Sequence, residues 1–163
     1  MKIKTFFSNK YEAVTPTASM RKLGPVARRV SSEGYAELIE PEYTEEGIVS
    51  KLKDLHDEDY VEAFKLGNSP RASTNGFSWS EEIKRGVLAM NAGMLDGARV
   101  AMEEGVAANI SQGFHHSCFS RGGGYCTFNG LALVASENPD KKIFVLDCDE
   151  HGGNGTHEFI TGR

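Results

Sequence analysis

The stretch VAANISQGFHHSCFSRGGGYCTFNGLALVASENPDKKIFVL, residues 106–146, decides the fold. Two short apolar runs, Val106–Ile110 and Ile143–Leu146, flank a glycine-rich polar loop and a helix predicted at Phe128–Ser136. A strand, a loop, a helix and a strand in this order are typical of a parallel sheet, whose strands are buried on both faces and therefore lack alternation. The stretch predicts an α/β fold in which ligands bind beyond the carboxyl ends of the strands.

Shorter elements are predicted upstream. In chain order they are a strand at Lys2–Phe7, a helix at Ser19–Ser31, a strand at Tyr35–Ile39, a helical segment at Ser50–Lys65 that is interrupted around His56–Asp59, and an exposed loop at residues 67–77. Gly24-Pro25 should delay or break the first of these helices, because proline lacks the N–H that a helix interior uses.

The strongest helical pattern lies between residues 78 and 105. Ser78 and Glu81 have the spacing of a capping box, and Gly105 is a typical C-terminal stop. Between them, apolar residues recur every three or four positions, at Ile83, Val87, Met90, Met94, Ala98 and Met102. This spacing predicts one long helix whose methionine-rich face packs in the core.

Composition predicts a single folded domain over residues 1–163. Of its 163 residues, 39% are hydrophobic and 25% are charged, and the net charge of -5 argues against general binding to nucleic acid. No signal peptide or membrane-spanning run is present, so we expect a cytoplasmic protein. The three cysteines, Cys118, Cys126 and Cys148, have no CxxC spacing and are expected to be free thiols.

Two adjacent histidines, His115 and His116, follow the first apolar run of the opening stretch. Neighbouring side chains point in different directions in most backbone conformations, so this pair suits two separate proton-handling groups better than one shared metal. A pair of structural loop histidines remains the alternative.

A second polar motif, LDCDEHGGNGT, runs from Leu146 into a glycine-rich segment. If the chain stays extended, Asp147, Asp149 and His151 lie on one side of it, and Asp and His are competent zinc ligands. The alternative for the carboxylates is a helix N-cap or a solvated turn, which leaves His151 unexplained.

Together the two motifs resemble one family, the superfamily of histone deacetylases, acetylpolyamine amidohydrolases and acetoin-utilisation proteins. The matching text is NISQGFHHSCFSRGGGYCTFNGLALVA followed by IFVLDCDEHGGNGTHEFI, with a weaker match upstream in LHDEDYVEAF. The resemblance implies a three-layer α/β/α fold with a mainly parallel sheet, of the arginase/deacetylase type. It also implies zinc-dependent hydrolysis of the amide of an acetylated amine, either acetyl-lysine or an acetylpolyamine.

The resemblance assigns roles to single residues. His115 and His116 match the family's paired general acid/base histidines, while Asp149 and His151 match two of its three zinc ligands. The remaining matches are residues that orient or line the site: Asp147, which orients the first histidine and helps to hold a potassium ion, Asn154, which orients the second, and Gly124 and Tyr125, which line the substrate channel. His56 and His157 are expected to be structural.

The resemblance covers only the N-terminal half of the family's catalytic domain, whose third zinc ligand and catalytic tyrosine come from later segments. Two functions therefore stay open: part of a zinc-dependent deacetylase, or a catalytically silent half-domain that acts as a binding or assembly module. In either case we expect an apolar sheet edge that drives self-association, as a homo-oligomer or with a complementing C-terminal half.

Overall fold

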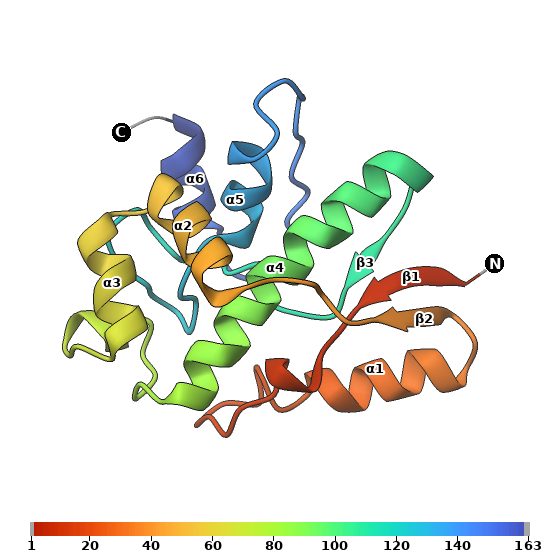
Figure 1. The fold of residues 1–163 in the computed structure, drawn as a ribbon, viewed down its shortest axis with the longest axis horizontal. Coiled ribbons are helices and arrows are strands. Elements are labelled where there is room, and N and C mark those ends of the chain that lie inside the picture. Colours follow the sequence, from red (N-terminus) through yellow and green to blue (C-terminus); the bar gives the residue numbers. More distant parts are fainter. Residues whose placement is uncertain (1, 162–163) are drawn as a thin grey trace. The chain divides into compact units, whose positions relative to one another are not determined.

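The computed structural model describes residues 2–161, which form two compact units (Figure 1). The first unit contains the chain up to Ile48 together with Ser80–Gln112, and the second contains Val49–Trp79 and the chain from Gly113 onward. The helix α2, Glu45–Leu55, crosses the boundary between them. All predicted site residues belong to the second unit.

The first unit contains a parallel sheet of three strands, β1 (Ile3–Phe6), β2 (Ala36–Ile39) and β3 (Ala108–Asn109), in the order β2-β1-β3. Ile3 of β1 pairs with Ala36 of β2, and Thr5 pairs with Ala108 of β3. The predicted strands at Lys2–Phe7 and Tyr35–Ile39 are confirmed with slightly shorter bounds, and that at Val106–Ile110 is confirmed only for its two residues Ala108–Asn109. Their parallel pairing confirms the α/β class.

Helix α1, Leu23–Ser32, connects the first two strands, after a short 3-10 helix at Asn9–Tyr11. It begins four residues later than the sequence predicts. Gly24 and Pro25 then lie in its first turn, where the backbone N–H groups have no partner inside the helix and proline is tolerated. The predicted delay at this dipeptide is confirmed.

Helix α4, Glu81–Glu104, is the long helix that the apolar spacing predicts. Its cap is Ser80, whose hydroxyl accepts a hydrogen bond from the backbone N–H of Ile83 at 3.2 Å, and not Ser78. The prediction of Ser78 was wrong because a side chain caps the N–H two or three residues after itself, and Ser78 stands too early for the first turn. Gly105 ends the helix with a φ of 92°, as predicted.

The buried face of α4 departs from the predicted methionine stripe. Met90 is fully buried, but Met102 is 49% exposed, and Gly93 and Gly97 carry the buried face instead. Residues four apart in an α-helix differ in direction by about 40° around the helix axis. Side chains spaced repeatedly by four therefore rotate away from the side of the helix that faces the core. The buried positions instead form a continuous run at residues 86–93, with Ile83 before it and Gly97 and Val100 after it.

Close packing in the first unit depends on Gly93. The buried Tyr11 hydroxyl lies against this glycine and donates a 3.0 Å hydrogen bond to Asn109 Oδ1. A Cβ at position 93 would collide with that hydroxyl. Asn109 in turn donates to the Met90 carbonyl of α4 at 3.2 Å. The end of β3 is thereby attached to the middle of the helix.

The second unit is built from helices and loops. Its helices are α3 (Glu58–Leu66), a 3-10 helix at Arg71–Ser73, α5 (Gly130–Ser136) and α6 (Asn154–Thr161). The predicted interruption near His56 is confirmed as the break between α2 and α3. Rings of Tyr60, Phe64 and Phe128 pack with centroids 5.1–5.2 Å apart and form the centre of its core.

The apolar run Ile143–Leu146 is not a strand, which contradicts the sequence prediction. It belongs to none of the three strands found in residues 2–161, and its Phe144 and Leu146 side chains are 86% and 76% exposed. An apolar run becomes a strand only when a neighbouring strand satisfies its backbone, and composition does not supply that neighbour.

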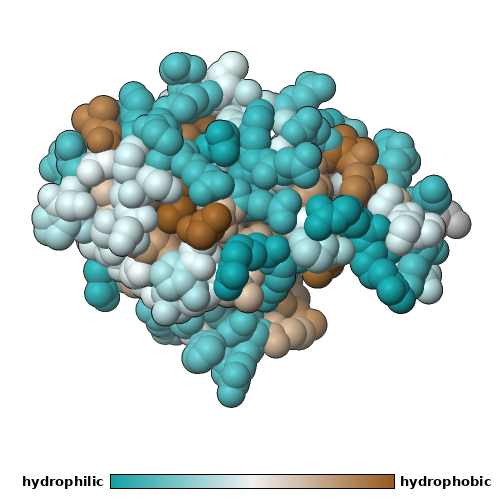
Figure 2. All heavy atoms as spheres, turned by 90° about the horizontal axis from the view of Figure 1, so that it is seen from below, coloured by the Kyte–Doolittle hydropathy of each residue, from teal (hydrophilic) through white to brown (hydrophobic). Residues whose placement is uncertain are grey.

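The surface is mixed in character. On the face drawn in Figure 2, hydrophilic side chains dominate, and apolar ones gather in small separate groups. Within residues 2–161, no helix has the length and apolar character needed to cross a bilayer.

Gly93→Ala should destabilise the protein by roughly 1–3 kcal/mol, because the added methyl overpacks the Tyr11 hydroxyl. Gly97→Ala is the matched control in the same helix: its Cβ would lie 3.6 Å from Phe6 Cδ2, an ordinary contact. Alanine also favours the helix by up to ~1 kcal/mol, so this change should be neutral or stabilising. Urea unfolding measures both, and equal effects would refute the packing role of Gly93.

Candidate active site

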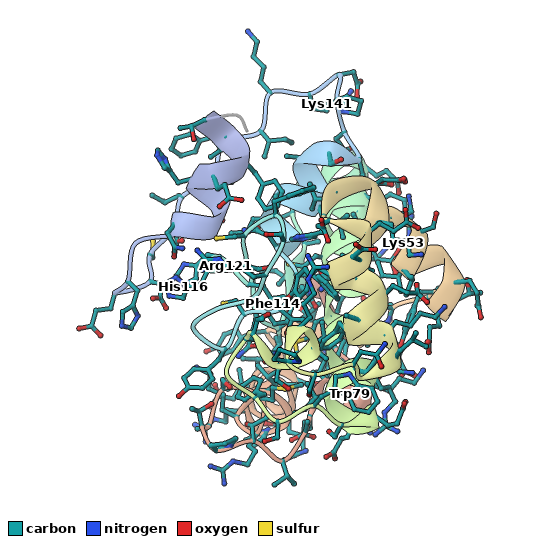
Figure 3. The ribbon with its side chains drawn as sticks, turned by 90° about the vertical axis from the view of Figure 1, so that its left-hand side faces the viewer. Lys53, Trp79, Phe114, His116, Arg121 and Lys141 are labelled. Atoms are coloured by element: carbon teal, nitrogen blue, oxygen red, sulfur yellow. The ribbon has the colours of Figure 1, made fainter. Side chains whose placement is uncertain are left out.

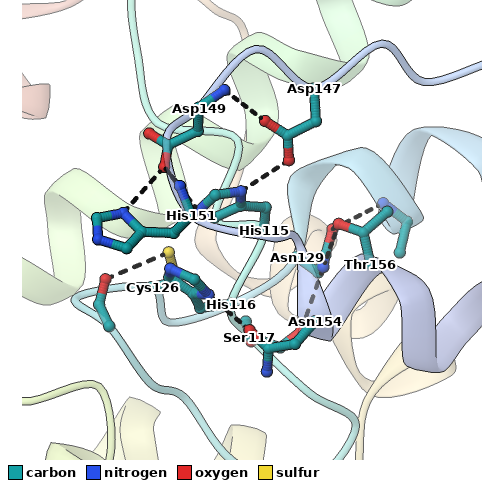
Figure 4. A network of polar contacts seen from close by, with 12 residues as sticks. His115, His116, Ser117, Cys126, Asn129, Asp147, Asp149, His151, Asn154 and Thr156 are labelled. Atoms are coloured by element: carbon teal, nitrogen blue, oxygen red, sulfur yellow. Dashed lines mark hydrogen bonds and ion pairs between the residues drawn. The ribbon is translucent and has the colours of Figure 1, made fainter.

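The predicted site residues gather around the start of α6 (Figure 4). They come from three segments of the second unit: the loop at residues 113–128, the turn at residues 147–153 and the first residue of α6. In the opening loop, Phe114 has a φ of 58°, an uncommon value for a residue with a side chain. This conformation turns the backbone immediately before the two histidines.

His115 is paired with Asp147. Its Nδ1 lies 2.7 Å from Asp147 Oδ2, while the other carboxylate oxygen accepts the backbone N–H of Asp149 at 3.0 Å. The His115 hydrogen bond, and after it the Asp149 backbone N–H, lower the pKa of the Asp147 carboxyl. An ionised carboxylate only accepts, so His115 carries a proton on Nδ1, and its Nε2 lies 3.8 Å from Asp149 Oδ1.

His116 is paired with Asn154, the first residue of α6. Its Nδ1 lies 2.6 Å from the Asn154 side-chain carbonyl oxygen, and the Asn154 amide nitrogen faces Cys118 Sγ at 3.8 Å. With the carbonyl as acceptor, His116 also holds its proton on Nδ1 and has a free Nε2. The two imidazole centroids lie 4.1 Å apart with the ring planes tilted by 51°, so the structure brings the two side chains together.

The segment after Asp147 does not stay extended, which corrects the sequence expectation. The backbone N–H of Asp149 bonds to Asp147, and that of His151 bonds to Asp149 Oδ1 at 2.9 Å, which makes two successive Asx turns. These bonds form because short carboxylates readily cap N–H groups two residues ahead. Asp149 and His151 still meet, but through a turn.

The Asp149 and His151 side chains are 51% and 71% exposed, with Asp149 Oδ1 3.1 Å from His151 Nδ1. Bonds from the backbone N–H and the ring of His151 lower the pKa of the Asp149 carboxyl. The 3.1 Å separation is near the ~3.3 Å expected between two ligands of tetrahedral zinc. No group of three or more His, Cys, Asp or Glu side chains that could hold a metal ion occurs in residues 2–161.

Gly124 and Tyr125 both have left-handed backbone conformations, with φ of 51° and 65°. A Cβ on Gly124 would collide with the His116 ring, so this position requires glycine. Tyr125 is 40% exposed and stacks on Phe77 at 5.0 Å. Tyr125 thus forms a fixed aromatic surface next to the glycine that touches His116.

A polar cavity of about 250 Å³ opens beside His116. The glycine backbone at residues 122–124 and the side chains of Cys118, Arg121 and Asn154 complete its wall. Figure 3 shows Arg121 and His116 near each other at this side of the unit.

Cys118 and Cys126 are buried, Cys148 is exposed, and all three are free thiols, as predicted. Burial raises the pKa of Cys126 to about 11, so this residue remains a neutral thiol at pH 7.

Asn129 is a site residue that the sequence analysis missed. Its buried side chain bonds to the loop after His116 and to α6, and its carbonyl oxygen caps α5 by accepting from Ala132 N at 3.0 Å. The available signal was an asparagine directly before an apolar helical run, which is typical of an N-cap.

Comparison with known proteins identifies the family of the chain. The family model described as the histone deacetylase domain matches residues 17–163. Histone deacetylase 2 of Arabidopsis thaliana is 29% identical over 156 residues, which cover 86% of this chain and 39% of that protein. The acetylpolyamine amidohydrolase of Mycoplana ramosa is 42% identical over 52 residues, or 30% of this chain and 15% of that protein.

Among solved structures, the acetylpolyamine aminohydrolase of Burkholderia pseudomallei shares the fold, with a TM-score of 0.82 at 16% identity. The match covers 99% of this chain and 60% of that one. The chain spans less than two fifths of the length of the first curated relatives it matches.

Asp147→Asn should reduce stability at neutral pH but have a progressively smaller effect in acid. The pKa of Asp147 is lower in the folded protein than its unfolded value of ~3.9. The pairing with His115 therefore stabilises the fold fully above the unfolded pKa, and this stabilisation disappears as the pH falls through the lower folded pKa. Urea unfolding of both proteins between pH 6 and pH 2.5 measures this difference. A constant difference across that range would show that the carboxylate charge contributes nothing.

Proposed function

The chain belongs to the histone deacetylase family, and we propose that it carries the acid–base part of a zinc-dependent deacetylase that hydrolyses acetylated amines. One observation above all supports this: His115 and His116 are each held through Nδ1, and their ring centroids lie 4.1 Å apart. Two adjacent bases of this kind can take a proton from water and deliver one to the leaving amine.

The two histidines differ in their partners. A carboxylate, Asp147, holds His115, and a neutral amide, Asn154, holds His116. Between them the two rings would handle the proton of the attacking water and the proton that the leaving amine receives.

Asp149 and His151 would hold the zinc ion, through a carboxylate oxygen and an imidazole nitrogen. When bound, zinc polarises an amide carbonyl and makes water more acidic. The pair is exposed and incomplete among residues 2–161, so a further ligand must join it from elsewhere. A potassium ion at Asp147 stays a prediction, as does a cytoplasmic location.

Gly124 and Tyr125 would line the channel for the acyl group. The aromatic face of Tyr125 is held by Phe77, and its backbone N–H donates to the Asn75 carbonyl at 2.8 Å. A fixed aromatic wall suits an extended alkyl amine such as the side chain of acetyl-lysine or an acetylpolyamine. Curated relatives bear the names of both enzyme classes, so both substrates belong in the test.

A catalytically silent binding or assembly module is the second candidate. The observation that favours it is the two-ligand metal pair, because zinc sites use three or four protein ligands. A surface for assembly is present: Phe144, Leu146 and Ile160 are each more than 70% exposed. Phe144 and Ile160 also line an apolar cavity of about 610 Å³, together with residues such as Leu131 and Phe159.

Zinc content and hydrolysis of an acetyl-lysine peptide and an acetylpolyamine distinguish the two candidates. For the enzyme we expect stoichiometric zinc, loss of turnover with a chelator, and a ~10²–10⁴-fold fall in kcat for His116→Ala. The matched control is His157→Ala, an exposed histidine on α6 outside the pair. Zinc-free protein without turnover would favour the silent module, and full activity of His116→Ala would exclude that residue from the mechanism.

The isolated chain should self-associate through its exposed apolar segment, as a homo-oligomer or with a complementing C-terminal half. Replacing both Phe144 and Leu146 with serine should weaken the association in sedimentation velocity runs. Val14→Ser, at an 80% exposed valine of the first unit, is the control and should have no effect. A wild-type protein that remains monomeric at all concentrations would contradict the prediction.

A further inference from the structure

We propose that His56 is a positioning residue which, together with Asn129, holds His116 against Asn154. This inference rests on the proposed function only for the role of His116 in proton transfer. The arrangement itself is a set of hydrogen bonds among buried groups in the second unit.

His56 is 2% exposed and follows the last turn of α2. Its Nδ1 lies 3.0 Å from the Cys118 carbonyl and 3.1 Å from that of Phe119, while its Nε2 accepts the backbone N–H of Asn129 at 3.1 Å. Carbonyls only accept and a backbone amide only donates. The ring is therefore neutral with its proton on Nδ1, and no other protonation state satisfies both sides.

Asn129 extends this contact to the site. Its Nδ2 donates to the Ser117 carbonyl at 3.2 Å and to Thr156 Oγ1 at 3.1 Å (Figure 4). Its side chain is fully buried, so each of these groups would lose a partner that water could not replace if the amide moved. One residue thus connects the loop after His116 to the first turn of α6.

The geometry of the His116 pair follows from these anchors. Residues on both sides of His116 are held, since the His115 carbonyl accepts Thr156 N at 3.0 Å and the Ser117 carbonyl accepts from Asn129. Asn154 stands two residues before Thr156 on the same helix. The hydrogen bonds of Thr156 to the loop around His116 therefore set the separation between Asn154 and His116. His56 holds the same loop further along, at the carbonyls of Cys118 and Phe119.

Apolar packing leaves the His56 ring no alternative position. Its centroid lies 5.3 Å from that of Phe128 and 5.2 Å from that of Phe159 on α6. A nonpolar ring of similar shape could fill this space but could make none of the three hydrogen bonds. Substitution by phenylalanine therefore separates the polar role from the packing role.

The test uses NMR of the full chain with ¹⁵N-labelled histidine, which identifies the tautomer of His56 and the solvent exchange of the His116 Nδ1 proton. We expect the Nδ1–H tautomer for His56. In His56→Phe, exchange at His116 should accelerate by about tenfold or more, the size expected when buried partners are lost. His56→Asn, which restores an N–H donor close to the ring Nδ1, should recover part of the protection.

Trp79→Phe is the matched control, because it removes one hydrogen bond of the same unit, from Trp79 Nε1 to the Phe64 carbonyl, outside the site. It should leave His116 exchange unchanged even if it lowers the melting temperature. Exchange in His56→Phe no faster than in this control would overturn the proposal. So would an Nε2–H tautomer in the wild type, a result that needs no folded variant. Neither measurement requires turnover, so an inactive chain would contradict the proposed function without affecting this inference.

Discussion

A buried amide has two N–H donors and one carbonyl, and all of them must find partners inside the protein. Asn129 meets this constraint by bonding to three segments at once: the loop at Ser117, the N-terminus of α5 and Thr156 of α6. The rest of the site depends on these hydrogen bonds. Ser117 is next to His116 in the chain, and Thr156 is two residues after Asn154. The buried polar groups of the second unit thus both stabilise it and fix the positions of the site residues.

The site itself contains two adjacent histidines with two kinds of hydrogen-bond partner. Nδ1 is engaged in both rings, by the Asp147 carboxylate in one and by the neutral Asn154 amide in the other. The two rings therefore make the same kind of hydrogen bond to partners of different charge.

Local patterns predicted the local structure well. The long helix that ends at Gly105, the break near His56 and the three parallel strands all follow from spacing, caps and apolar runs. One error arose where a segment depends on a distant partner: residues 143–146 have the composition of a buried strand, but no strand pairs with them in the described residues. Other errors were local: Ser80 caps the long helix in place of Ser78, and Asx turns replace the expected extended chain after Asp147.

The sequence by itself determined which chemical groups are present, their order along the chain and the family to which they belong. It did so because the motifs are short and their residue types are specific to the chemistry. Only the tertiary structure decided that His115 meets Asp147 and that His116 meets Asn154, across separations of 32 and 38 residues. It also gave His56 a place in the site, because a buried ring takes its role from the backbone groups that surround it, and no local pattern encodes those.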